Sequence, residues 1–149
     1  LLDEPTNGVD PVSRRELWDL LREFVEQGMA VLISTPYMDE AARCHRVGLI
    51  HQGRLLTEGE PDNLLADFPH RTFELTGVER DRAEGLLRGH PGVLGFSPAG
   101  SRIRLVVDRA AVEDLSDAVE GIGGGLQDIR PDFEDVFLAR LAEDREGQP

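Results

Sequence analysis

The sequence contains no lysine, because all sixteen of its basic residues are arginine. A phosphate-binding loop of the Gly-x-x-x-x-Gly-Lys-Ser/Thr type uses a lysine to reach the β- and γ-phosphates, so the chain holds no such loop. The single cysteine, Cys44, excludes an internal disulfide bond and is typical of a reducing compartment. No signal peptide and no apolar run of membrane-spanning length is evident, so we expect a soluble, cytosolic chain.

Positive charge is also scarce. The 149 residues carry 29 Asp and Glu against 16 Lys and Arg, for a formal net charge of −13. This excess argues against nucleic acid as a partner and against polybasic attachment to anionic lipid. The length suffices for one domain with a core or for two small ones. An initiator methionine is missing as well, and from this we expect the carboxyl-terminal part of a longer protein.

The opening stretch, residues 1–11, reads Leu-Leu-Asp-Glu-Pro-Thr-Asn-Gly-Val-Asp-Pro. An apolar strand that ends in two carboxylates suits the chemistry of a metal-bound nucleotide. The first carboxylate, Asp3, can hold Mg²⁺ directly or through water, and the second, Glu4, can orient or deprotonate an attacking water. Taken alone, the pair is better interpreted as the acidic end of a strand, packed against the turn that follows. The attached residues 5–11 shift the interpretation to a functional one.

The next residues predict an α/β arrangement. Asp10 followed by Pro11 predicts the start of a helix, which we expect to end at Gly28. The continuous apolar run over residues 29–35 predicts a strand buried on both faces of a parallel sheet. The sequence further predicts a short helix over residues 38–44, a hairpin turning at Gln52-Gly53, and a small helix from Pro61, with Pro69 closing this region.

The rest of the chain follows another pattern. Strands are expected near residues 72–76, 93–96, 102–107 and 126–129, with helices over 79–88 and 111–122 and a last helix capped by Asp132. The order β-α-β-β-α-β predicts a small ferredoxin-like α+β module. We therefore expect two domains, residues 1–69 with part of a parallel sheet and residues 70–149 as an accessory module.

Three stretches resemble one family. Residues 1–11 are similar to the Walker B strand and D-loop of an ABC-type ATPase. Residues 34–44, Ser-Thr-Pro-Tyr-Met-Asp-Glu-Ala-Ala-Arg-Cys, are similar to its switch region, and residues 131–138 resemble the ending of many ABC export ATPases. The resemblance implies a partial P-loop NTPase fold and the carboxyl-terminal portion of the ATP-binding subunit of an ABC transporter, of the multidrug or ABC-2 export type.

The resemblance also implies roles for single residues. Asp3 would be the Mg²⁺ carboxylate of a bound MgATP, Glu4 the catalytic base, and Asp10 part of the segment that crosses to the partner's nucleotide site. Pro36 stands where the family has a histidine that contacts the γ-phosphate, and proline offers no comparable donor. Either the loop keeps its shape and water positioning depends on Glu4 alone, or the nucleotide site is degenerate, which is the interpretation we favour.

By resemblance, the intact subunit would bind ATP and Mg²⁺, dimerise with a second ABC nucleotide-binding domain, and drive a membrane permease from the cytoplasmic face of the membrane. The chain itself shows no Walker A loop, glutamine loop or signature sequence. We expect it to bind ATP negligibly and to hydrolyse none by itself.

Two other classes stay open. One is an ABC protein without a transport role, acting in translation or DNA repair. The other is a non-enzymatic regulatory or dimerisation module, in which residues 71–142 sense a small molecule and the acidic motif is a relic. The four histidines show no metal-ligand spacing. The glycines of residues 121–125 follow a predicted helix, so they indicate a helix end rather than a phosphate loop.

Overall fold

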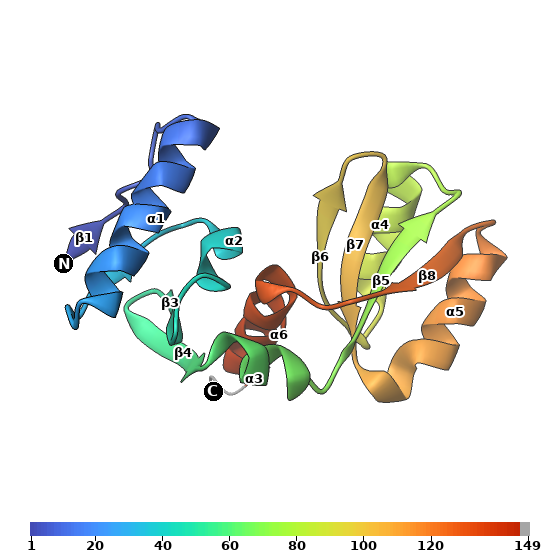
Figure 1. Ribbon diagram of the computed structural model, residues 1–149. Coiled ribbons are helices and arrows are strands. Elements are labelled where there is room, and N and C mark those ends of the chain that lie inside the picture. The colour runs from blue at the N-terminus through green and yellow to red at the C-terminus, as the bar shows by residue number, and fades with distance from the viewer. Residues whose placement is uncertain (147–149) are drawn as a thin grey trace. The chain divides into compact units, whose positions relative to one another are not determined.

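The computed structural model describes residues 1–146, which form two compact units that divide after Glu40. In the first unit, strand β1 (Leu2–Asp3) pairs in parallel with strand β2 (Ile33–Ser34), and helix α1 (Pro11–Glu26) connects them. The register aligns Leu2 with Ile33 and Asp3 with Ser34. The predicted β-α-β unit is therefore present, and Figure 1 shows its first strand, β1, beside α1. Because the two strands are parallel and in register, both end at the same edge of their small sheet.

The ends of α1 are set by local sequence. Asp10 is extended, and its carboxylate accepts hydrogen bonds from the backbone N–H groups of Val12 and Ser13, while Pro11 occupies the first helical position. At the other end Gly28 adopts a φ of +91°, a left-handed conformation that favours glycine over residues with a side chain. The predicted cap and stop are both confirmed.

The strand predicted over residues 29–35 is mostly absent, because only Ile33 and Ser34 form β2. Met29 and Leu32 are exposed, at 53% and 69%, so the expectation of a strand buried on both faces is wrong for the structure described. Strand length depends on a neighbour to pair with, and the neighbour of β2 in the described residues is the two-residue β1.

The second unit begins near the short helix α2 (Met38–Ala41), which is shorter than predicted. Strands β3 (Val47–His51) and β4 (Arg54–Gly59) form the expected antiparallel hairpin. Gln52 and Gly53 both have positive φ, of 48° and 77°, as a tight two-residue hairpin turn requires. Helix α3 (Pro61–Ala66) follows.

The compact division after Glu40 lies earlier than the domain boundary predicted between residues 69 and 70. Helix α6 (Phe133–Glu146), at the other end of the chain, contacts β4 and α3. These contacts join the hairpin and α3 to the unit that contains the following sheet.

That sheet has four antiparallel strands in the order β6-β7-β5-β8: β5 (Arg71–Thr76), β6 (Val93–Ala99), β7 (Arg102–Val107) and β8 (Gly125–Ile129). Helix α4 (Arg80–Gly89) lies between β5 and β6 in the chain. The 3-10 helix η1 (Arg109–Ala111) and helix α5 (Val112–Gly121) lie between β7 and β8. The observed order of elements is the one that the sequence predicts.

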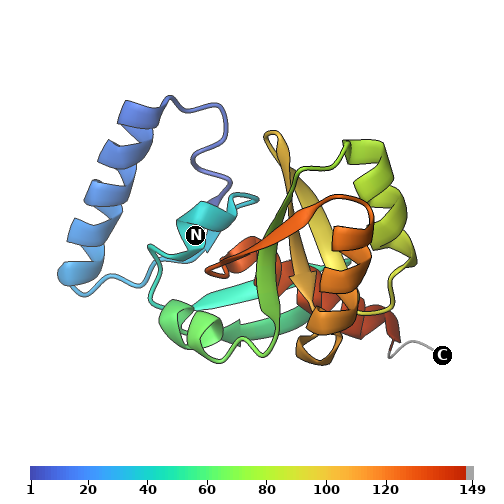
Figure 2. The same cartoon turned by 90° about the vertical axis from the view of Figure 1, so that its right-hand side faces the viewer.

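Helices α4 and α5 contact each other and cover one face of the sheet (Figure 2). Their buried side chains pack on alternate residues of β5 and β7, and this core consists of Phe73, Leu75, Ala83, Leu87, Ile103, Leu105, Val107, Leu115 and Val119. Helix α6 packs on β6 and β7 from the opposite face. There Gly95 permits a close approach, since a Cβ at this position would lie 2.9 Å from Cβ of Leu138.

Two further properties hold for residues 1–146. None of their helices combines the length and apolar character needed to span a bilayer. Nor do three or more of the His, Cys, Asp and Glu side chains that are described gather into a cluster that could hold a metal ion.

Candidate functional site at the carboxyl ends of β1 and β2

Asp3 and Glu4 lie where β1 ends, beside the end of β2. The hydroxyl of Ser34 donates a hydrogen bond to Oδ1 of Asp3, and the backbone N–H of Glu4 donates to the carbonyl oxygen of Ser34 at 2.9 Å. The parallel pairing brings Ser34 next to Asp3, and the Ser34 hydroxyl orients the Asp3 carboxylate. Both carboxylates remain accessible to solvent.

Glu4 has an unusual backbone conformation. Its φ of 43° is left-handed, which is uncommon for a residue other than glycine and recurs at functional sites. The turn that follows stabilises this conformation, because the backbone N–H of Asn7 donates to the carbonyl of Glu4 at 3.1 Å. The side-chain amide of Asn7 also donates to Oε2 of Glu4, over 3.3 Å. The second carboxylate is thus oriented by its own turn.

The carboxylates of Asp3 and Glu4 are suitable ligands for a Mg²⁺ ion that is also bound by the phosphates of a nucleotide. Mg²⁺ prefers oxygen ligands and is usually bound by one or two carboxylates together with substrate phosphates and water. Asp3 supplies one such carboxylate, with Ser34 holding it in place. Among the side chains that the structure describes, no third acidic group joins this pair in a metal-binding cluster. The protein groups present therefore suit an ion that takes its remaining ligands from phosphate and water.

The hydrogen bonds of Asp10 are made to the start of α1 and not to Asp3 or Glu4. Its Oδ1 accepts from the backbone N–H of Val12 at 2.9 Å and of Ser13 at 3.1 Å. A side-chain hydrogen bond from Ser13, followed by these backbone bonds, lowers the pKa of Asp10. The charged carboxylate therefore stabilises the start of α1, and this structural role is sufficient to explain the residue at this position.

Pro36 is exposed in the loop after β2. The loop is held on both sides of the proline, because the hydroxyl of Thr35 accepts from the backbone N–H of Tyr37 at 3.1 Å and donates to Oε2 of Glu40 at 2.7 Å. Pro36 itself provides neither a side-chain polar group nor a backbone N–H. The loop shape thus depends on its neighbours.

Glu40 connects this loop to α1. Its side chain is fully buried, and Oε1 lies 3.8 Å from Nε of Arg14. The Arg14 guanidinium stacks over the ring of Tyr37 with 4.5 Å between its carbon and the ring centroid, a cation–π contact. A buried carboxylate is retained only when hydrogen bonds and charge compensate its lost hydration, and Thr35 and Arg14 supply both.

The sequence predicted Asp3, Glu4, Asp10 and Pro36 as site residues, but it missed the residues that position them. Ser34 and Asn7 hold the two carboxylates, and the contacts of Arg14 and Glu40 shape the loop after β2. A usable signal existed for Ser34: two parallel strands end at one sheet edge, so a polar residue at the end of the second strand is expected to meet the acid at the end of the first.

The structure therefore places two neighbouring carboxylates, Asp3 and Glu4, at the end of a parallel strand. Comparison with known proteins identifies the class. No family model matches the chain. Curated ABC transporter ATP-binding proteins do, and the chain is homologous to these proteins over more than nine-tenths of its residues.

Particular relatives show how far the similarity extends. The chain is 38% identical over 144 residues to the probable multidrug ABC transporter ATP-binding protein YbhF of Escherichia coli (strain K12), which covers 95% of this chain and 25% of that protein. It is 36% identical over 147 residues to the daunorubicin resistance ATP-binding protein DrrA3 of Streptomyces coeruleorubidus, covering 93% and 43%. The Nod factor export ATP-binding protein I of Paraburkholderia xenovorans (strain LB400) is 43% identical over 67 residues, or 44% of this chain. The chain spans less than half the length of these relatives.

Proposed function

We propose that this chain is the carboxyl-terminal portion of the ATP-binding subunit of an ABC exporter. Residues 1–69 would complete the nucleotide-binding domain, with the Walker B strand end, D-loop and switch loop. Residues 70–149 would form an accessory module of the ferredoxin-like type, which the antiparallel β-α-β-β-α-β order supports. The names of the relatives, which refer to multidrug transport, daunorubicin resistance and Nod factor export, support an export role.

The acidic pair carries this proposal. Asp3 and Glu4 stand at the end of a parallel strand, with Ser34 on the neighbouring strand holding the first carboxylate. In this role Asp3 would hold the magnesium ion of MgATP, and Glu4 would orient an attacking water and accept its proton. The magnesium ion would neutralise part of the negative charge of the phosphates. Asp10 would place the segment that reaches the second nucleotide site.

The partners follow from the same proposal. A second ABC nucleotide-binding domain would complete each nucleotide site. ATP binding and hydrolysis would then drive transport through a membrane permease. The protein would then act at the cytoplasmic face of the cell membrane. Nucleic acid is not expected as a partner, since the formal charge of the chain is −13.

Calorimetric titration with MgATP tests the proposal. The 149-residue chain has no phosphate-binding lysine, so it is expected to give no heat of binding at micromolar concentrations. A chimera in which this chain replaces the matching 147 residues of DrrA3 regains the remaining nucleotide-binding segments and is expected to bind MgATP. Low-micromolar binding by the chain alone, or none by a folded chimera, would contradict the proposal.

A further inference from the structure

The second unit contains a cavity that the proposed ATP-binding role does not use. It has a volume of about 370 Å³ and lies where β5 begins and β8 ends. Strand β8 is at the edge of its sheet and pairs with β5 alone among the described strands, with Thr72 opposite Ile129. The cavity therefore opens to solvent beside an edge strand. Its volume is in the range found for sites that bind small organic molecules.

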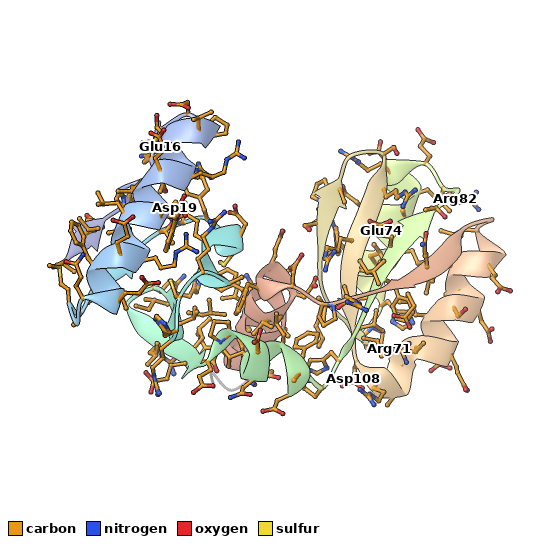
Figure 3. All side chains as sticks on the ribbon, viewed as in Figure 1. Glu16, Asp19, Arg71, Glu74, Arg82 and Asp108 are labelled. Carbon is orange, nitrogen blue, oxygen red and sulfur yellow. The ribbon has the colours of Figure 1, made fainter. Side chains whose placement is uncertain are left out.

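Three basic side chains line this cavity, namely His70, Arg71 and Arg130. Their gathering is notable in a chain whose formal charge is −13. Asp128 also lines the cavity and forms an ion pair with Arg71. A guanidinium has five N–H donors, so this pair orients Arg71 (labelled in Figure 3) and still leaves donors for a ligand.

Arg130 adds an unbalanced positive charge. Its side chain is exposed, and no ion pair involves it within the described part of the chain, although its carbonyl accepts from Arg104. His70 is largely buried, and its Nε2 lies 3.4 Å from Oε1 of Glu143 on α6. The two arginines among the lining residues thus outnumber the one carboxylate residue, Asp128, which favours a ligand with negative charge.

Thr72 also lies at the cavity, but its hydroxyl does not open into it. The Thr72 Oγ1 atom is buried from solvent. Successive side chains of a strand point to opposite faces of the sheet, so Thr72 points away from the face that carries Arg71. The groups that could meet a ligand are therefore the arginines and the apolar wall.

The rest of the lining is apolar. Phe68, Ile129 and Pro131 complete the wall, and the Phe68 ring meets the His70 ring edge to face with 5.5 Å between centroids. Flat apolar surfaces of this kind bind an aromatic ring, whereas guanidinium groups bind a carboxylate. We propose that this cavity binds a small aromatic carboxylate, with its charged group at Arg71 and Arg130 and its ring against Phe68 and Pro131.

Titration of the ¹⁵N-labelled 149-residue chain with 2-naphthoate tests this proposal by NMR. Binding with a dissociation constant on the order of 1 mM is expected for a ligand of this size, with amide shifts concentrated in residues 70–72 and 128–130. The uncharged analogue 2-naphthamide and inorganic phosphate should each bind at least tenfold more weakly. Equal binding of naphthamide would overturn the role of charge, and equal binding of phosphate would overturn the role of the apolar wall. No binding of naphthoate, or shifts elsewhere, would overturn the site itself.

Variants make the test specific. Arg71→Ala and Arg130→Ala should each weaken naphthoate binding by about tenfold. Arg82→Ala removes an exposed guanidinium from α4, away from the cavity lining, and should leave binding unchanged. Unchanged binding in both arginine variants would contradict the proposal.

Discussion

Arg104 on β7 binds Asp135 on α6 through two parallel hydrogen bonds, one of them from Nε to Oδ1 at 2.9 Å. Asp135 is fully buried and also accepts from the backbone N–H of Asp132 at 2.8 Å. The pKa of Arg104 is raised, mainly by its hydrogen bond with Asp135. This pair fixes the first turn of α6 to the sheet.

Removal of Arg104 is therefore expected to be costly. Arg104→Ala leaves the Asp135 carboxylate buried without its cation, and we expect the free energy of unfolding to fall by about 3 kcal/mol. Arg102→Ala is the matched control on the same strand, because Arg102 forms a more exposed ion pair with Glu74 (labelled in Figure 3). Its loss should cost less than about 1 kcal/mol. Urea unfolding of both variants measures the difference. Equal losses would show that Asp135 does not depend on Arg104.

Asp10 gives the first unit a pH dependence. Because hydrogen bonds to Ser13 and Val12 lower its folded-state pKa, the charged carboxylate stabilises the folded chain at pH values above the unfolded pKa, which is about 3.9. This stabilisation is lost as the pH falls through the lowered folded pKa.

An asparagine isolates the contribution of Asp10. Asp10→Asn keeps an oxygen that caps α1 but cannot titrate, so the stability difference between parent and variant should be constant at neutral pH and shrink below about pH 4. Thermal unfolding across this range measures it. Asp19→Asn on the exposed face of α1 (Figure 3) is the control. A difference that grows on acidification would reverse the sign of the effect and contradict the lowered pKa.

Pro36 decides whether the proposed nucleotide site is degenerate. In the chimera with DrrA3, Pro36→His restores a side-chain donor in a loop that Thr35 and Glu40 already hold in shape. We expect steady-state ATP turnover to rise by at least tenfold, while the affinity for MgATP stays within about threefold. Turnover that is as fast with Pro36 as with histidine would show that the loop does not need the donor.

Much of the fold could be predicted because its signals are local. The cap at Asp10, the turn at Gln52-Gly53 and the order of elements in residues 71–146 each depend on neighbouring residues and on short periodic patterns. The extent of β2 could not be predicted in this way. An apolar run becomes a strand only where another strand pairs with it, and that partner lies far away in the sequence.

The same limit applies to the candidate site. Its acidic residues and the proline were found because a contiguous motif contains them. The contacts of Ser34 with Asp3 and of Arg14 with Glu40 join residues from different elements, and only the folded chain brings them together. The cavity beside Arg71 was also missed, because its lining comes from the start of β5 and the end of β8, two paired strands that are distant in sequence.

The central claim is that Glu4 acts as the base of an ATPase. The most direct test is steady-state MgATP turnover by the Pro36→His chimera before and after Glu4→Gln, with MgATP binding measured in parallel. We expect Glu4→Gln to lower turnover by at least about a hundredfold while binding is retained, because the amide can hold a water but cannot take its proton. Glu16→Gln, on the exposed surface of α1 (Figure 3), should leave turnover unchanged. Turnover by Glu4→Gln that equals that of Glu16→Gln would contradict the account.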